Sequence, residues 1–442
     1  MNDARRLAAM RGLRQAAYGM LAIVLAVSLT DRGLSPAAIG ALVTVSLAGD
    51  FVGTLVIGRW ADVWGRRRTL TVLAVVMALT GLIFGVLGWY PLLLVVAFCG
   101  TLGTSASETA PFLPIEQAML AQVGPSHGRT ALFARYNLVA SVAGALGALA
   151  AGLPDLMARH GVAARVSLFV PFALYALAAL VVAWLAAHLS PAVEAHSSVV
   201  APSAAVARKA EEPAVTPGSP DAPPTAGQRS SRWDRLPLPV LGVSRGMVLR
   251  LAGLYSVDAF AGGFVTQTLL ALFFHLRFGI PLDTLAVLFF GANLLAALSF
   301  LAAPALARRF GLLNTMVFTH LPSNVLLVLV PLMPTFPLAA ITLLLRQTLS
   351  QLDVPTRQAY TMALVEPGER TATASVTSLA RSAGSASSPV LAGALLQGPL
   401  VVLGLPLLVA GGLKAMYDLA LWRIFRRVPQ PDVPQRSAGS RP

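Results

Sequence analysis

The chain has 442 residues, of which 56% are hydrophobic and only 12% are charged, and its mean hydropathy is +0.71. A soluble domain averages about a quarter charged residues, so this composition excludes a soluble enzyme and a disordered protein. The net charge of +14 comes mainly from arginines clustered between apolar runs, which argues against nucleic-acid binding and favours an integral membrane protein.

Apolar runs bounded by glycine, proline or charge follow one another along the whole chain. A membrane-spanning helix needs about 20 mostly apolar residues, and twelve runs meet that length. The sequence therefore predicts an all-α polytopic membrane protein with twelve transmembrane helices in two pseudo-symmetric six-helix bundles. The expected spans are 15–30, 36–58, 70–88, 92–121, 130–152, 166–188, 248–274, 283–306, 313–333, 336–363, 370–396 and 400–422.

Residues 189–246 differ from the runs on either side, because prolines stand there among alanine, serine and charged residues. Such a stretch cannot bury enough apolar surface to offset its chain entropy, which predicts a disordered linker. The predicted parts are an N-terminal bundle at 1–188, the linker at 189–246, a C-terminal bundle at 247–428 and a tail at 429–442.

The distribution of arginine and lysine predicts the orientation of the chain across the membrane. If the N-terminus is cytoplasmic, 24 of the 33 basic residues fall on that side, 4 fall on the opposite side and 5 fall within spans. Loops rich in these residues stay in the cytoplasm. Both termini, the linker and the tail are therefore expected there, with the protein in a plasma membrane such as the bacterial inner membrane.

The two halves contain matching polar residues, which indicates a duplication. Pro114, Glu116 and Gln117 match Pro355, Arg357 and Gln358 at an offset of 241 residues. At an offset of 246, Gly33, Ala61, Gly65 and Thr69 match Gly279, Ala307, Gly311 and Thr315.

The loop between the second and third expected spans reads Gly-Arg-Trp-Ala-Asp-Val-Trp-Gly-Arg-Arg-Arg-Thr-Leu, from Gly58 to Leu70. It resembles the signature loop of the major facilitator superfamily, G-x-L-A-D-x-x-G-R-R/K-x-x-L. The resemblance implies a secondary transporter with a small-molecule substrate, acting as a monomer in the lipid bilayer. It also implies a cytoplasmic latch that locks the outward-open state, formed by Gly58, Asp62, Gly65, Arg66 and Arg67. The alternative is a basic turn that only anchors the loop.

Other family features are missing from this sequence. The fourth span has no arginine between Val96 and Gly103, and the fifth lacks the Gly-Pro pair of the usual antiporter motif. Proton-coupled antiport therefore does not follow from the resemblance. The sequence has no P-loop, paired-histidine or nucleophile motif, so we expect no cofactor, metal site or enzymatic activity.

Charges inside the membrane cost about 2.5 to 3.5 kcal/mol each, so those that remain usually face a partner or an aqueous cavity. The tenth span is the most polar, because Arg346, Ser350, Asp353, Arg357 and Tyr360 recur every three to four residues on one helical face. This stripe predicts contact with a substrate or coupling ion. A structural pair between Asp353 and Arg357 is the alternative.

The repeat places Glu116 and Gln117 at positions equivalent to those of Arg357 and Gln358. Opposite charges at such positions predict a gate, or a site for a zwitterionic or polar solute, across the central cavity. Arg381 lies level with Asp353, about 15 Å deep at 1.5 Å per residue, and is a further candidate for a substrate contact or gate. A salt bridge between Asp353 and Arg381 is the alternative.

A proton-coupling residue must gain and lose a proton, which an isolated buried carboxyl can do. Glu108, with no arginine nearby in its own helix, is the first candidate, followed by Asp258 and Asp50. Lys414 and Asp418 are spaced to neutralise each other on the last span. His320 is expected to be a satisfied polar group.

The sequence thus favours a transporter that exports a small organic solute by alternating access, either uncoupled or driven by protons. One alternative is an uptake symporter for a polar or anionic metabolite. Another, from a different class, is a transporter-like membrane receptor or enzyme without flux.

Overall fold

The structure is a computed structural model that describes residues 3–99, 101–104, 111–123, 129–194, 244–366 and 369–428. Within these ranges the side chains of residues 58, 59, 62, 121, 123, 129–131, 134 and 371 lie outside the description. Every regular element that it describes is helical, and nine of the described segments are long and apolar enough to cross a membrane. The fold class is therefore the expected one.

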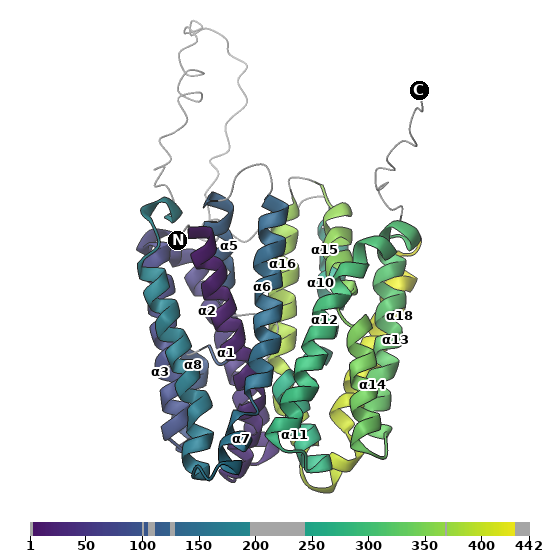
Figure 1. Cartoon of the computed structure of the whole chain (residues 1–442). Helices are drawn as coiled ribbons and strands as arrows, with labels where there is room; N and C mark the ends of the chain where they lie inside the picture. The colour runs from purple at the N-terminus through teal and green to yellow at the C-terminus, as the bar shows by residue number, and fades with distance from the viewer. Residues whose placement is uncertain are drawn as a thin grey trace, which may run out of the picture.

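The helices form two groups that stand side by side (Figure 1). The first half contains α1 (Asp3–Asp31), α2 (Pro36–Trp64), α3 (Arg66–Val86), α4 (Tyr90–Cys99), α5 (Phe112–Val123), α6 (Arg129–Ala150), α7 (Leu153–Arg159), α8 (Ala164–Ala187) and η1 (Pro191–Val193). The second half contains α10 (Arg245–Gly263), α11 (Gln267–Phe278), α12 (Leu282–Phe310), α13 (Leu312–Leu329), η4 (Val330–Leu332), α14 (Phe336–Leu349), α15 (Asp353–Ala363), α16 (Arg370–Ser387), α17 (Pro389–Leu395), η6 (Gly398–Leu403) and α18 (Leu405–Phe425). The expected linker at 189–246 lies mostly outside the described residues.

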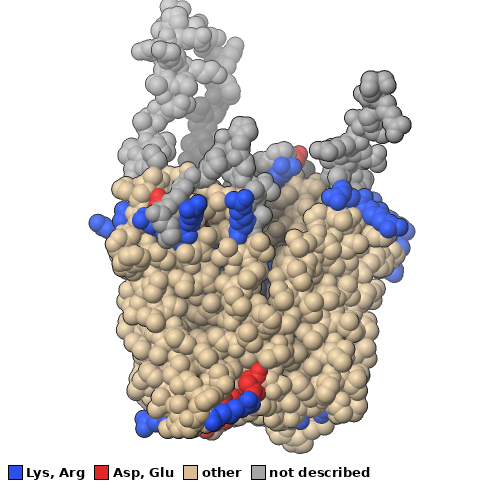
Figure 2. All heavy atoms as spheres, viewed as in Figure 1, with Lys and Arg blue, Asp and Glu red and all other residues tan. Residues whose placement is uncertain are grey.

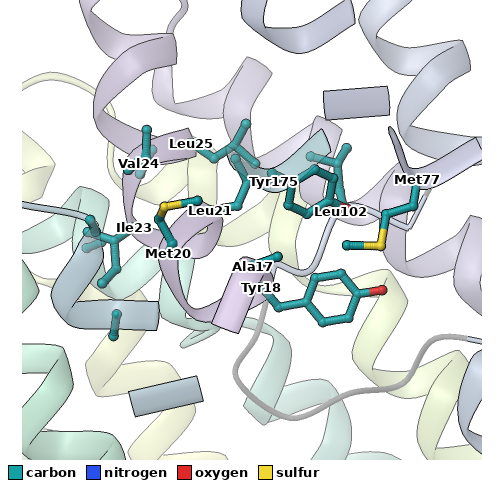
Figure 3. Packing of buried hydrophobic residues seen from close by; sticks show 14 of the residues in the cluster. Ala17, Tyr18, Met20, Leu21, Ile23, Val24, Leu25, Met77, Leu102 and Tyr175 are labelled. Carbon is teal, nitrogen blue, oxygen red and sulfur yellow. The ribbon is translucent and has the colours of Figure 1, made fainter. Parts of the chain in front are cut away.

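The first span is longer than expected, because α1 begins at Asp3 and not near residue 15. It is the most buried of the apolar spans, with 89% of its apolar window inside the protein. Figure 3 shows Tyr18, Met20 and Leu21 of this helix among side chains from other elements, including Met77 and Tyr175. Arg11 and Arg14 are therefore buried in a core helix, whereas Arg5 is exposed at its start.

Four expected spans are each two helices in the structure, and the fourth is divided between α4 and α5. The seventh is divided between α10 and α11, where Thr266 accepts a hydrogen bond from the backbone of Leu269 and starts a new helix. The tenth is interrupted between Leu349 and Asp353, and the eleventh at Ser388 before Pro389. The interruption places Pro355 in the first turn of α15, where proline is tolerated.

The described polar contacts between the halves lie at the lower end of Figure 1 or at mid-depth. At the lower end Arg159 pairs with Asp283, whose backbone nitrogen also donates to Asp155 at 2.9 Å. Nearby, a Cβ on Gly40 of α2 would lie 2.4 Å from the carbonyl oxygen of Pro389. Figure 2 shows a gap between the halves toward the upper end, so the lower end is closed and the upper end is open.

Candidate functional site

The first half contains a buried ion pair that connects α1 to α5. The guanidinium of Arg14 donates to both carboxylate oxygens of Glu116 at 2.7 Å, and both side chains have no exposed surface. The hydroxyl of Tyr136 on α6 donates to the same carboxylate. Two opposite charges with parallel hydrogen bonds can remain in a low-dielectric interior, because each satisfies the other.

The second half contains a larger buried cluster around Asp258 of α10. Its carboxylate contacts Lys414 at 2.5 Å, Arg381 at 3.0 Å and Arg357 at 3.3 Å. Arg357 also binds Asp353 at 2.9 Å, so the structural pair considered for the tenth span does form. The side chain of Arg381 is 34% exposed, whereas those of the other members are at least 90% buried.

These two clusters are related by the internal repeat with their charges exchanged. In the first half, the base Arg14 is on the first span and the acid Glu116 is on the fourth. In the second half, the acid Asp258 is on the first of its six spans and the base Arg357 is on the fourth. The expected meeting of Glu116 and Arg357 across the cavity is therefore wrong for this conformation, because each is held within its own half.

The salt bridge between Asp353 and Arg381, considered as the alternative to a substrate contact, does not form. Arg381 binds Asp258, while Asp353 binds Arg357 one turn away on the same helix. The sequence could not show this, because the depth of a residue says nothing about the direction in which its side chain points across the bundle.

The remaining polar residues of the tenth span occupy different environments. Arg346 is 9% exposed, and its Nη1 donates to the side-chain oxygen of Gln347 at 2.9 Å. Ser350 donates to the same oxygen at 2.8 Å. Among the described groups, the Nε atom of Arg346 and the hydroxyl of Tyr360 are buried without a hydrogen-bond partner.

The two glutamines that follow the repeated charges do not join these clusters. Gln117 is half-buried on α5, and Gln358 is exposed on α15. Their positions in the internal repeat are the one observation that makes Gln117 and Gln358 candidates for contact with a solute.

The three proton-coupling candidates have different outcomes. Glu108 lies outside the described residues. The charge of Asp258 is compensated by three cations, which removes the isolation on which its candidacy rested. Asp50 is 7% exposed, and within the described part of the chain its Oδ1 atom has no hydrogen-bond partner. Asp50 is therefore the described carboxyl that fits the expectation.

The loop that resembles the family signature begins α3 with an unusual cap. Gly65 ends α2 and starts α3 at a φ of 98°. The carboxylate of Glu194, just after η1, accepts hydrogen bonds from the backbone nitrogens of Arg66 at 2.7 Å and Arg67 at 3.3 Å. A carboxylate at a helix N-terminus satisfies unpaired amides and complements the helix dipole. Sequence reasoning missed Glu194 because it lies 128 residues away.

The arginine side chains of this loop also bind within the first half. Arg66 donates to the side chain of Gln122 at 2.8 Å, and Arg67 donates to the carbonyl of Ala187 at 2.7 Å. The side chain of Asp62 lies outside the description, and nothing further is described for Gly58. The described part of the expected latch thus makes contacts with the C-cap of η1 and with α5 and α8 of the first half.

The expected pair between Lys414 and Asp418 is wrong. Lys414 binds Asp258, and Asp418 instead lies 2.9 Å from the Nδ1 atom of His320 on α13. Asn324 donates to Asp418 at 2.8 Å. His320 is a satisfied polar group, as expected, although its partner is a carboxylate on another helix.

Similarity to known proteins agrees with this arrangement. The Major Facilitator Superfamily profile matches residues 7–350. An uncharacterized membrane protein of Saccharomyces cerevisiae, YJR124C, is 28% identical over 425 residues, which are 93% of this chain and 92% of that protein.

Solved structures share the fold at low sequence identity. The nucleoside transporter NupG superposes with a TM-score of 0.68 at 14% identity, covering 96% of this chain and all of that one. The xylose transporter XylE of E. coli, in an inward open conformation, gives a TM-score of 0.68 at 14% identity over 97% and 96% of the two chains. A bacterial homolog of the human lysosomal transporter Spinster, inward-facing and unoccupied, gives 0.65 at 15% identity over 96% and 97%. The profile covers more than three quarters of the sequence, and the chain belongs to the major facilitator superfamily.

Proposed function

We propose that this protein is a secondary transporter that moves a small organic solute bearing an acidic group by alternating access between its two halves. The observation that carries the proposal is the excess of one cation in the charge cluster of the second half, which contains the partly exposed Arg381. The family and the fold support transport, while the charges support the class of solute.

The excess is visible in the residues around Asp258. Four cations, Arg346, Arg357, Arg381 and Lys414, accompany three carboxylates, Asp258, Asp353 and Asp418. An unbalanced charge in a low-dielectric interior is costly unless an ion of opposite sign or water reaches it. Arg346 has no carboxylate within salt-bridge distance among the described residues, and Arg381 is partly exposed. A carboxylate or phosphate on a solute supplies the missing negative charge.

The upper end of Figure 1 is the cytoplasmic end in this proposal. The basic residues of the N-terminus, of the α2–α3 loop and of the end of α18 belong to that end, which is the distribution that retains loops in the cytoplasm. The conformation is then inward-open. This agrees with the names given to the similar XylE and Spinster-homolog structures.

Efflux is the direction that the signature loop favours, through its resemblance to exporters. Uptake by proton symport is the second candidate, and the buried cations favour it because an anionic solute entering with a proton crosses with less net charge. Asp50, a buried carboxyl with a free oxygen among the described groups, is the proposed proton carrier in the first half.

Solute counterflow in proteoliposomes tests the proposal. Vesicles preloaded with an unlabelled solute should accumulate the same labelled compound when it is a monocarboxylate, a phosphorylated compound or an amino acid, but not when it is a neutral sugar or an amine. Arg381→Gln should abolish this exchange, and Arg381→Lys should retain part of it. Arg277→Gln, at the other end of the same half, should exchange as the wild type does. Exchange restricted to neutral or cationic solutes would contradict the proposed class, and no exchange at all would favour a receptor or enzyme.

The latch is tested separately. Asp62→Asn should reduce exchange severalfold while the protein remains folded in the membrane, because it removes the charge that the resemblance assigns to the locked state. The measurement is counterflow at equal protein content, with Asp31→Asn at the other end of the bundle as the control. Unchanged exchange in Asp62→Asn would leave the loop as a basic anchor only.

A further inference from the structure

A buried histidine and aspartate lie on the side of the second half that faces away from the gap. His320 of α13 is 5% exposed and Asp418 of α18 is fully buried. The Nδ1 atom of His320 lies 2.9 Å and 3.1 Å from the two oxygens of Asp418, and Asn324 donates to that carboxylate at 2.8 Å. Imidazole is the side chain whose charge ordinarily changes between about pH 5 and 8, so a proton can be gained or lost here.

This pair is connected to the gap by a chain of charged contacts. Lys414 lies one turn before Asp418 on α18 and binds Asp258 at 2.5 Å. The other oxygen of Asp258 binds Arg381 at 3.0 Å, and Arg381 is 34% exposed. The chain therefore leads from His320, through α18 and α10, to a cation that a solute can reach.

The side chain of Lys414 can reach either of two carboxylates, Asp258 and Asp418. Residues four apart on a helix lie on the same face, so Asp418 is within the range of the flexible lysine side chain that now binds Asp258. Removing the countercharge from a buried carboxylate is strongly unfavourable. Lysine should therefore follow whichever of Asp258 and Asp418 is less compensated.

We propose that His320 and Asp418 form a proton-binding site whose occupancy decides which carboxylate binds Lys414 and, through Asp258, how firmly Arg381 is held. With the proton bound, the imidazolium neutralises Asp418, and Lys414 stays on Asp258 as in the structure. Without it, Asp418 attracts Lys414, and Asp258 depends on Arg357 and Arg381. The proton comes from water and adds to Nε2, since Nδ1 keeps its hydrogen on Asp418.

The charged groups near His320 come from several helices. α18 contributes Asp418 and Lys414, and α10 contributes Asp258, with the ring of Tyr417 packed edge-on against the imidazole. The neighbouring helices α12, α14 and α15 carry Arg308, Arg309, Arg346, Asp353 and Arg357, whose described hydrogen bonds and ion pairs do not include His320. Asp418 is thus the hydrogen-bonded carboxylate of this site, and Lys414 is the cation able to compete for it.

The consequence for transport rests on the proposed function. Protonation keeps Lys414 on Asp258, which leaves Arg381 freer to bind the acidic group of a solute. By linkage, a bound anion must raise the proton affinity of His320 by the same factor. The proton and the solute anion then bind cooperatively, which is the condition for symport.

Lysine signals provide the test, because Lys209 and Lys414 are the only lysines in the chain. The full-length Lys209→Gln protein, with ¹⁵N-labelled lysine Nζ and ¹³C-labelled histidine Cε1, is placed in lipid nanodiscs and titrated from pH 5 to 9 by NMR. We expect the Lys414 signal to change at the same midpoint as the His320 signal. His320→Gln should abolish the lysine transition, whereas His275→Gln should leave it unchanged.

Two further variants test the connection to the gap. Asp258→Asn should leave Lys414 on Asp418 and give one lysine signal at every pH. Arg381→Gln should raise the common midpoint, by up to one pH unit for a tenfold gain in proton affinity, because Asp258 then needs Lys414 more.

A Lys414 signal that stays constant while His320 titrates would overturn the proposal, and so would a His320 that does not titrate in this range. The titration of the Lys209→Gln protein alone decides the matter if a further variant fails to fold. Failure of the counterflow experiment would overturn transport but not this titration, so the two failures are distinguishable.

Discussion

At the residue scale, the pairing of Arg14 with Glu116 is the contact that could least be predicted from the sequence. Arg14 follows Arg5, Arg6 and Arg11, so the positive-inside pattern makes it look like part of a cytoplasmic arm. The structure buries it completely against a residue 102 positions away. Asp353 and Arg357 could be paired from the sequence because they are four residues apart on one helix, whereas Arg14 and Glu116 could not.

The first prediction concerns the strength of this contact. Glu116→Gln should destabilise the protein by about 3 to 5 kcal/mol, because it leaves the guanidinium of Arg14 buried without a countercharge. The measurement is the free energy of unfolding, or the apparent Tm, of purified protein in detergent.

The matched control is Arg159→Gln, which removes an ion pair whose arginine is 66% exposed and should cost less than about 1 kcal/mol. The double variant Arg14→Leu with Glu116→Leu should recover most of the lost stability, since it leaves no unpaired charge. Equal losses in Glu116→Gln and Arg159→Gln would show that the buried pair is not held as described.

At the element scale, the internal repeat is visible in the turns as well as in the sequence. Gly65 and Gly311 each end one long helix and begin the next, at φ values of 98° and 82°. Their backbone nitrogens donate to Ala61 and Ala307, each at 3.0 Å. The match of these four residues across the halves, predicted from the sequence, is therefore confirmed as the same turn built twice.

The second prediction follows from that backbone conformation. Gly65→Ala and Gly311→Ala should each destabilise the protein by about 1 to 3 kcal/mol, because a residue with a Cβ atom is strained at such φ values. Gly412→Ala should have little effect, since an added Cβ there meets no atom within 4 Å on an ordinary helical backbone. Thermal unfolding of the three variants in detergent makes the comparison, and equal stability of all three would contradict it.

The interrupted helices show where the sequence was insufficient. An apolar run predicts that a segment crosses the membrane, but it does not show whether one helix or two do so. The break after Leu349 occurs within a polar stripe that keeps helical spacing on both sides, so periodicity gave no signal of it. Thr266 and Ser388 are N-cap residue types, but within apolar spans they resemble ordinary polar residues of a helix.

At the scale of the whole molecule, each half contains its own buried ion pairs, and the described polar contacts between the halves lie at the lower surface and at mid-depth. At mid-depth the side chain of Gln267 donates to the carbonyl of Gly19, and that of Thr268 donates to the carbonyl of Thr104. Two rigid bodies joined in this way can separate at the closed end and approach at the open end.

The third prediction concerns the closed end. Gly40 and Gly393 bring α2 and α17 together, and an added Cβ on Gly393 would lie 2.3 Å from the carbonyl oxygen of Pro36. Gly40→Trp should therefore prevent the lower ends from closing and shift the population toward the state that is open there. Gly412→Trp, in open space on α18, should not shift it.

The measurement that tests the alternation of the halves most directly is a pair of distances by electron spin resonance. Spin labels are placed in a Cys99→Ser background at Arg68 and Arg309 for the upper end, and at Trp89 and Leu332 for the lower end, all exposed in the structure. Gly40→Trp should lengthen the lower distance and shorten the upper one together, relative to the wild type. A lower distance that lengthens while the upper one stays unchanged would contradict the rigid rocking of two halves and, with it, the proposed mechanism.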